Sequence, residues 1–247
     1  MEQHFKIRTS GRKYIYGVLR GALGRQLVVF VHGFTGHMNE HQFFNAASYF
    51  AENGFPSFRF QLYSWEKNAR KLHECTLATH AYDLDRVIRY FRRKGVRMIF
   101  VVGHSYGGKT ILMSKEKKYD GVVLWDPSHR FSRLFNKARY LKTFDAYLHM
   151  DDTPYHVLVG RQMVREEIAI GCEESIQEIH VPVKIISAGK GVLVRGGQWY
   201  YQRANQPKAF VVVEDATHCF DEEGTEERLF RETLSWLKRF SKTPKRL

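Results

Sequence analysis

Continuous apolar runs alternate with amphipathic stretches along most of this 247-residue chain. This alternation restricts the fold classes that the chain can adopt. Apolar runs rich in β-branched and aromatic residues predict strands at 26–31, 55–62, 97–102, 121–125, 183–187 and 209–213. Helical periodicity predicts helices at 42–53, 79–94, about 106–117 and 226–240, and a hairpin is predicted from 4–9 and 14–19. Strands of this kind between helices indicate an α/β fold, with a mostly parallel sheet covered by helices on both faces.

The alternation lapses between residues 126 and 181. We therefore expect an α/β core formed by 1–126 and 181–247, with 127–180 inserted as a cap over the carboxyl ends of the strands, where open α/β sheets bind ligands. Five aromatic or apolar cap residues have the spacing of an apolar helical face: Phe131, Leu134, Phe135, Tyr140 and Phe144.

Composition excludes several other classes of protein. With 43% hydrophobic residues and mixed charges the chain is not disordered, and no apolar run reaches the length of a membrane span. The amino-terminal residues do not resemble a signal peptide, and the three cysteines lack metal-ligand spacing, so we expect a cytoplasmic protein. The formal net charge of +13 is scattered, without zinc-finger or RNA-binding signatures. It predicts loose attraction to anionic surfaces and no specific nucleic-acid partner.

Residues 103–107, Gly-His-Ser-Tyr-Gly, match the pattern G-x-S-x-G directly between a predicted strand and a predicted helix. This context is typical of a nucleophile elbow, which projects a serine hydroxyl above the sheet. Ser105 is therefore the candidate nucleophile. The alternative is a glycine-rich turn whose serine only caps the helix. His104, inside the turn, is expected to support it and to take no part in proton transfer.

A serine hydroxyl needs a base to remove its proton. His218 follows the last predicted strand and precedes the closing helix, so its loop can return an imidazole to the elbow. An oxyanion hole is expected from the backbone N–H groups of Tyr106, next to the nucleophile, and Phe34, in the turn after the strand 26–31.

Three stretches carry a resemblance to a known family: 32–36 (His-Gly-Phe-Thr-Gly), 103–108 (Gly-His-Ser-Tyr-Gly-Gly) and 216–220 (Ala-Thr-His-Cys-Phe). With them, the chain resembles serine esterases of the α/β-hydrolase superfamily, including cinnamoyl (feruloyl) esterases and monoacylglycerol lipases. The resemblance implies an eight-stranded, mostly parallel sheet, a cap, and hydrolysis of a small-molecule ester through an acyl-enzyme. No metal or organic cofactor is implied.

One departure from the family concerns the acid of the catalytic triad. The family usually carries this acid just after the strand predicted here at 183–187, where this chain has Gly191. Asp126, which follows the strand 121–125, is the best substitute, since some lipases of this fold take their acid from that strand. Asp215 and a triad without an acid are alternatives, as are the cap carboxylates Asp151, Asp152, Glu173 and Glu174.

The sequence therefore predicts a serine hydrolase of carboxylic esters, lipase-like, with thioesters as a neighbouring substrate class. Ser105 would be its nucleophile, His218 its base and Asp126 its acid. The alternative is a binding or regulatory protein on a hydrolase scaffold, its chemistry weakened because Gly191 stands where the acid is expected.

Overall fold

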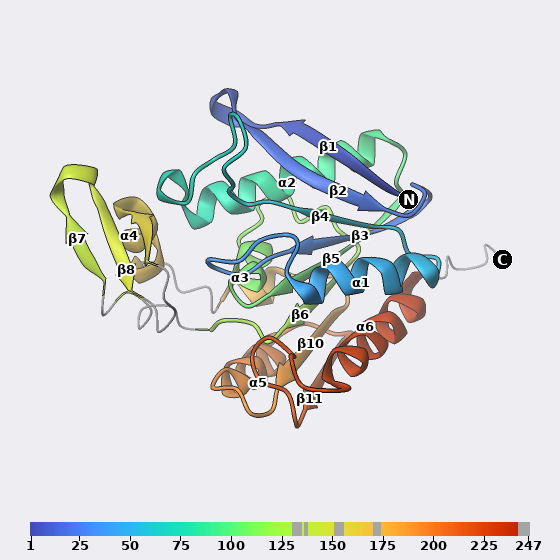
Figure 1. Ribbon diagram of the computed structural model, residues 1–247. Coiled ribbons are helices and arrows are strands. Elements are labelled where there is room, and N and C mark those ends of the chain that lie inside the picture. The colour runs from blue at the N-terminus through green and yellow to red at the C-terminus, as the bar shows by residue number, and fades with distance from the viewer. Residues whose placement is uncertain (130–134, 136–137, 151–155, 170–173, 242–247) are drawn as a thin grey trace.

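An eight-stranded sheet forms the centre of the protein in the computed structural model, which describes residues 1–129, 135, 138–150, 156–169 and 174–241 (Figure 1). The strand order is β1-β2-β4-β3-β5-β6-β10-β11, and from β4 to β11 all neighbours are parallel. β1 and β2 are antiparallel additions at one edge. The bounds are β1 Glu2–Arg8, β2 Tyr14–Arg20, β3 Gln26–Val31, β4 Ser57–Phe60, β5 Met98–His104, β6 Gly121–Trp125, β10 Val183–Ala188 and β11 Lys208–Val213. The predicted α/β-hydrolase fold with its mostly parallel sheet is confirmed.

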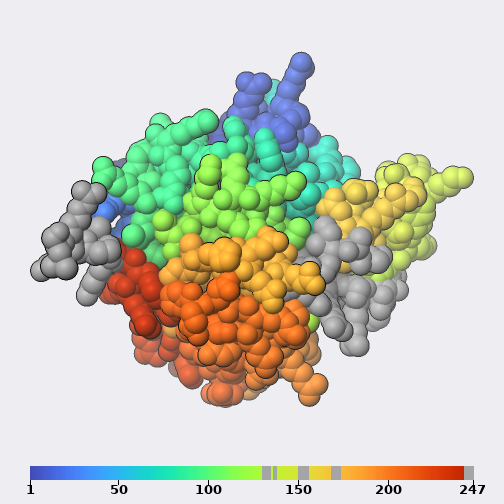
Figure 2. All heavy atoms as spheres, turned by 180° about the vertical axis from the view of Figure 1, so that it is seen from behind, coloured from blue at the N-terminus to red at the C-terminus, as the bar shows by residue number. Residues whose placement is uncertain are grey.

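Helices cover both faces of this sheet because successive strand residues point to opposite sides. In β3, Leu27 and Val29 belong to one core cluster, whereas Val28 and Phe30 belong to the other. The first cluster includes residues of α2 (Leu77–Arg93), α3 (Tyr106–Leu112) and α5 (Val194–Arg203), and the second includes residues of α1 (His41–Glu52) and α6 (Thr225–Ser241). Figure 2 shows, from behind, the green segment of α2 above the orange segment of α5.

Local side-chain chemistry sets the helix bounds. α2 begins two residues before the predicted start because the Thr76 hydroxyl accepts from the Thr79 N–H at 3.1 Å, and the Thr79 hydroxyl accepts from the Thr76 N–H at 2.8 Å. α3 ends at Leu112, earlier than predicted, because the following residues leave the helical path. The Ser114 hydroxyl donates to Asp85 of α2, and Lys117 has a φ of 43°. α5 was not predicted.

A smaller antiparallel sheet lies between β6 and β10 in the sequence, and its strands stand to one side of the central sheet in Figure 1. It consists of β7 (Arg139–Leu141), β8 (Ala146–Met150) and β9 (His156–Gly160), followed by α4 (Arg161–Ala169). The short helix η2 (Leu72–Glu74) contacts β9, and α2 contacts α4.

The predicted apolar helical face in this insertion is wrong for the described residues. Tyr140 lies in β7, opposite Tyr147 of β8, and Phe144 lies in the connecting 3₁₀ turn. The turn closes through Asp145 in the left-handed conformation (φ 45°), which aspartate tolerates, so the chain returns as a hairpin. Phe135 lies in a turn, and Phe131 and Leu134 lie outside the described residues. None of the described helices is long and apolar enough to cross a membrane.

Candidate active site

Ser105 stands in a strained turn between β5 and α3. Its φ of 54° and ψ of −118° are unfavourable for a residue with a side chain, and such strain persists only where the surroundings impose it. A Cβ on Gly103 would lie 2.6 Å from the carbonyl carbon of Gly107, and a Cβ on Gly107 would lie 2.1 Å from the Val31 oxygen. Only glycine allows these approaches, so residues 103–107 form the predicted elbow.

The loop after β3 lies directly beside this elbow. A Cβ on Gly33 would be 3.3 Å from Ser105 Cβ, and the rings of Phe34 and Tyr106 have centroids 5.9 Å apart. The ring of His32 fixes the loop, since its Nε2 accepts from the Leu62 N–H at 3.0 Å and its Nδ1 lies 2.8 Å from the Gly33 oxygen. Burial lowers the pKa of His32 to about 4, which keeps the ring neutral and able to accept.

His218 meets a carboxylate from β6. Its Nδ1 lies 2.6 Å from Asp126 Oδ2, and the other oxygen of Asp126 accepts from the Ala188 N–H at 3.1 Å. Asp126 is fully buried and comes directly after β6, whereas His218 lies in the loop between β11 and α6. Because the carboxylate accepts at Nδ1, the neutral imidazole presents its lone pair at Nε2.

His104 ties the His218 loop to the elbow. A carbonyl can only accept, so His104 Nε2 donates to the His218 oxygen at 2.8 Å, and Nδ1 is left to accept from the Gln42 amide at 3.0 Å. Burial lowers the pKa of His104 to about 3, consistent with this neutral tautomer. The rings of His104 and His218 lie 4.6 Å apart. These contacts agree with the predicted supporting role of His104.

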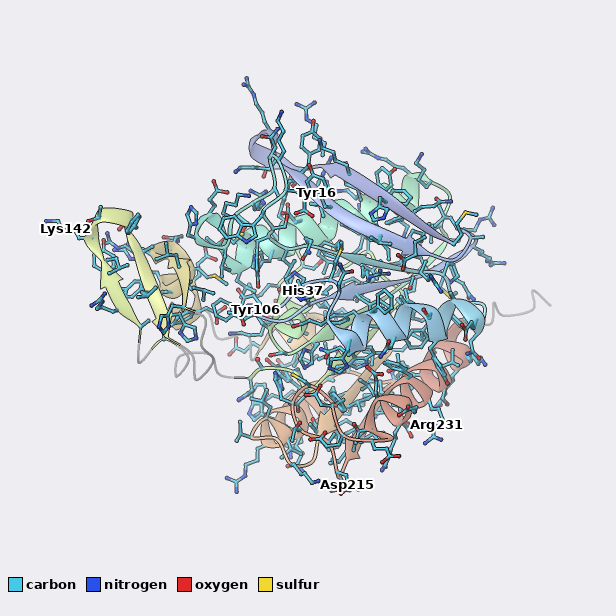
Figure 3. The ribbon with its side chains drawn as sticks, in the orientation of Figure 1. Tyr16, His37, Tyr106, Lys142, Asp215 and Arg231 are labelled. Atoms are coloured by element: carbon cyan, nitrogen blue, oxygen red, sulfur yellow. The ribbon has the colours of Figure 1, made fainter. Side chains whose placement is uncertain are left out.

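The position that usually carries the acid lies against the Asp126 carboxylate. A Cβ on Gly191 would be 3.4 Å from Asp126 Oδ2. The carboxylate of Asp126, which follows β6, therefore lies next to the loop after β10. Asp215 lies elsewhere: its side chain is 85% exposed, 3.8 Å from Lys190, and Figure 3 shows it at the edge of the molecule away from Tyr106. Glu174 is exposed at the start of a short 3₁₀ helix, and Asp151, Asp152 and Glu173 lie outside the described residues.

Sequence reasoning missed one polar contact to Ser105. Ser128 Oγ lies 3.1 Å from Ser105 Oγ, and both side chains are buried. The sequence offered one signal for this contact: Ser128 lies two residues after Asp126, in an Asp-Pro-Ser turn. Only the aspartate of this turn was predicted to belong to the site.

An apolar cluster adjoins the elbow on the side of the small sheet. Phe34 packs against Phe135 and His149, with ring centroids 5.8 and 5.7 Å away. The same cluster contains Tyr106 and residues of β9 and α4. Beside it, Lys109 of α3 forms a buried ion pair with Glu167 of α4, which ties the inserted segment to the core.

Glu40 adds a further carboxylate near the candidate site. Its oxygens would lie 2.7 and 2.8 Å from a Cβ on Gly36, at the end of the loop after β3. Burial raises the pKa of Glu40 to about 7, opposed by the nearby imidazoles of His41 and His218. Cys219, next to His218, is a poor candidate for thiol chemistry because burial raises its pKa to about 11. Across the described residues, no group of His, Cys, Asp or Glu side chains is arranged to hold a metal ion.

Comparisons with known proteins agree with this architecture. The chain is similar to Est1E from Butyrivibrio proteoclasticus, solved with ferulic acid bound, with 18% identity over 96% of this chain and 99% of that chain and a TM-score of 0.80. It is similar to the hydrolase GrgF from Penicillium sp. sh18 (15% identity, 97% and 99% coverage, TM-score 0.80). A monoacylglycerol lipase from Paleococcus ferrophilus is also similar (17% identity, 92% and 99% coverage, TM-score 0.69).

A sequence search among curated proteins gives no significant match. The family model of the alpha/beta hydrolase family matches residues 28–231, which include the elbow, Asp126 and His218. This chain therefore belongs to the alpha/beta hydrolase family.

Proposed function

We propose that this protein is a serine hydrolase that cleaves carboxylic esters through an acyl-enzyme. Ser105 is the nucleophile, His218 the base and Asp126 the acid, and the N–H groups of Phe34 and Tyr106 form the oxyanion hole. The observation that carries the proposal is the 2.6 Å contact between Asp126 and His218, on a loop that His104 ties to the elbow of Ser105.

In this mechanism His218 Nε2 takes the proton of Ser105 while Oγ attacks the ester carbonyl. Asp126 holds the imidazole in the required tautomer and stabilises the imidazolium. The two backbone N–H groups bind the oxyanion, and the loss of one such donor typically costs about 3–4 kcal/mol of transition-state stabilisation. The imidazolium protonates the departing alcohol. His218 then activates a water molecule that hydrolyses the acyl-enzyme.

The substrate is a small-molecule ester with an apolar acyl group. The relatives support this class, since one was solved with ferulic acid and another is a monoacylglycerol lipase. Phe34 and Phe135, which belong to the apolar cluster beside the elbow, offer apolar contacts to such a group. Residues 127–180 act as the cap over this side, and thioesters are a neighbouring class because the same groups attack them. The reaction needs no cofactor.

The alternative of a weakened binding protein rested on the missing acid at Gly191. The contact between Asp126 and His218 supplies a carboxylate to the imidazole and so favours the enzyme.

A fluorophosphonate probe, which reacts with activated serines, tests the proposal. Labelling of the native protein and its loss in Ser105→Ala are expected, together with turnover of p-nitrophenyl esters. Ser57→Ala is a matched control: Ser57 is buried in β4, its hydroxyl has no hydrogen-bond partner within the described structure, and labelling should persist. No labelling and no turnover of short or long esters by the native protein would overturn the proposal.

A further inference from the structure

A second serine hydroxyl reaches the nucleophile. Ser128 Oγ lies 3.1 Å from Ser105 Oγ, and the two residues are 5% and 9% exposed. Either hydroxyl can donate in this bond, because each carries one rotatable proton and can also accept. The contact involves the atom that attacks the ester in the proposed mechanism.

The backbone around Ser128 is fixed on several sides. Its N–H donates to the Ser105 oxygen at 3.2 Å, and its carbonyl accepts from the Tyr200 hydroxyl at 3.0 Å. The preceding Pro127 packs on the start of α3, where a Cβ on Gly108 would lie 3.2 Å from its ring. Ser128 therefore keeps its hydroxyl beside the nucleophile without a loop movement.

We propose that Ser128 is a further catalytic residue, which donates a hydrogen bond to Ser105 Oγ while negative charge develops on that oxygen. This inference rests on the proposed function. The proton of Ser105 passes to His218 Nε2, and Ser128 keeps its own proton and only turns it toward Oγ. No covalent bond to Ser128 forms or breaks.

The charge on Ser105 Oγ determines which of the two hydroxyl groups donates the hydrogen bond between Ser105 and Ser128. In the resting protein both hydroxyls are neutral, and either orientation is available. When Oγ loses its proton, only the orientation with Ser128 as donor is favourable, and a hydrogen bond to a charged oxygen is roughly twice as strong as one between neutral groups. Only such a difference between ground state and transition state accelerates a reaction.

Negative charge develops on the same oxygen in two transition states of the cycle. It attacks during acylation and it is the leaving group when water hydrolyses the acyl-enzyme. Ser128 is therefore expected to assist both steps. A residue that only packs against the elbow would not show this pattern.

The test is burst kinetics of Ser128→Ala with a p-nitrophenyl ester, which separates acylation from deacylation. We expect both rates to fall about tenfold, from the loss of a charge-assisted hydrogen bond. The KM should change less than kcat, and fluorophosphonate labelling should slow by a similar factor at an unchanged melting temperature. Ser128→Thr keeps the hydroxyl and should recover most of the rate. Ser57→Ala is again the matched control, since its hydroxyl is not near the reacting atoms.

Unchanged or faster rates in Ser128→Ala would overturn the inference while leaving the proposed function intact. If Ser128→Ala does not fold, Ser128→Cys carries the same test, because it keeps a side chain of similar size with only a weak donor. An inactive native protein, by contrast, would overturn the proposed function itself.

Discussion

Replacing Asp126 with asparagine changes the charge at His218 while keeping the shape of the side chain. The amide oxygen of the new side chain can still accept from the Ala188 N–H, so the turn after β6 should be retained. The amide nitrogen then faces His218 Nδ1 at the present 2.6 Å separation. Because it donates, Nδ1 must accept, and the ring proton moves to Nε2, where it blocks uptake of the Ser105 proton. In serine proteases the same change lowers kcat by ~10⁴. We expect a loss of this order, about 5 kcal/mol of activation free energy.

A second carboxylate position allows this reasoning to be tested by rescue. Gly191 has no positive φ, and a Cβ there would lie 3.4 Å from Asp126 Oδ2 and 3.2 Å from the Ala188 oxygen. The substitution Asp126→Ala empties the space of this carboxylate. In that background, Gly191→Asp should return a carboxylate to His218 and raise kcat at least tenfold over Asp126→Ala alone. Val192→Asp in the same background is the control, because Val192 is 93% exposed. It should recover nothing.

Steady-state hydrolysis of a p-nitrophenyl ester measures each variant, with thermal unfolding to verify the fold. Asp126→Asn within tenfold of the native kcat, at an unchanged melting temperature, would refute the assignment of the acid. Equal recovery by Val192→Asp would refute the geometric explanation of the rescue.

Three further predictions concern folding and stability. Gly107→Ala should abolish soluble expression, because its Cβ would lie 2.1 Å from a backbone oxygen, whereas Gly24→Ala, with open space around it, should express normally. Lys109→Met leaves the buried Glu167 without its ionic partner, so urea unfolding should show a loss of about 3–5 kcal/mol, and the double variant with Glu167→Leu should recover most of it. In the folded protein Glu40 keeps its proton until about pH 7, whereas the unfolded chain releases it near 4.5, so this residue lowers stability as the pH rises through that window. Glu40→Gln should remove this dependence and add up to about 3 kcal/mol at pH 8 in the same measurement; an identical pH profile would contradict the shift.

The sheet and the elbow could be predicted because their signals are local. A buried parallel strand such as β5 is one apolar run, and the turn at Ser105 needs its glycines within five residues. The α/β-hydrolase family could be recognised from three such stretches. The missed elements had weaker signals: α5 carries two glycines among its aromatic residues, and the hairpin of β7 and β8 depends on the backbone conformation of Asp145.

The proposed acid could only be ranked from the sequence, because the carboxylate that contacts His218 depends on which strands are neighbours. β6 and β10 are parallel and adjacent, and the Asp126 N–H donates to the Ile186 oxygen at 2.7 Å. This pairing brings Asp126 next to Gly191, 65 positions along the chain. The contact of Ser128 with Ser105 was not predicted for the same reason: the position of Ser128 two residues after Asp126 was visible in the sequence, but its approach to Ser105 depends on the pairing of β5 with β6.

In the proposed mechanism, the location of Asp126 also links the acid to the segment between β6 and β10. Here the carboxylate lies on the last residue before the inserted segment, so the two share one stretch of backbone. A chimaera that exchanges this segment must therefore be joined beyond Ser128. If the junction were made at the end of β6, this chain would lose the Asp126 carboxylate along with the exchanged segment, and Gly191 has no side chain that could replace it.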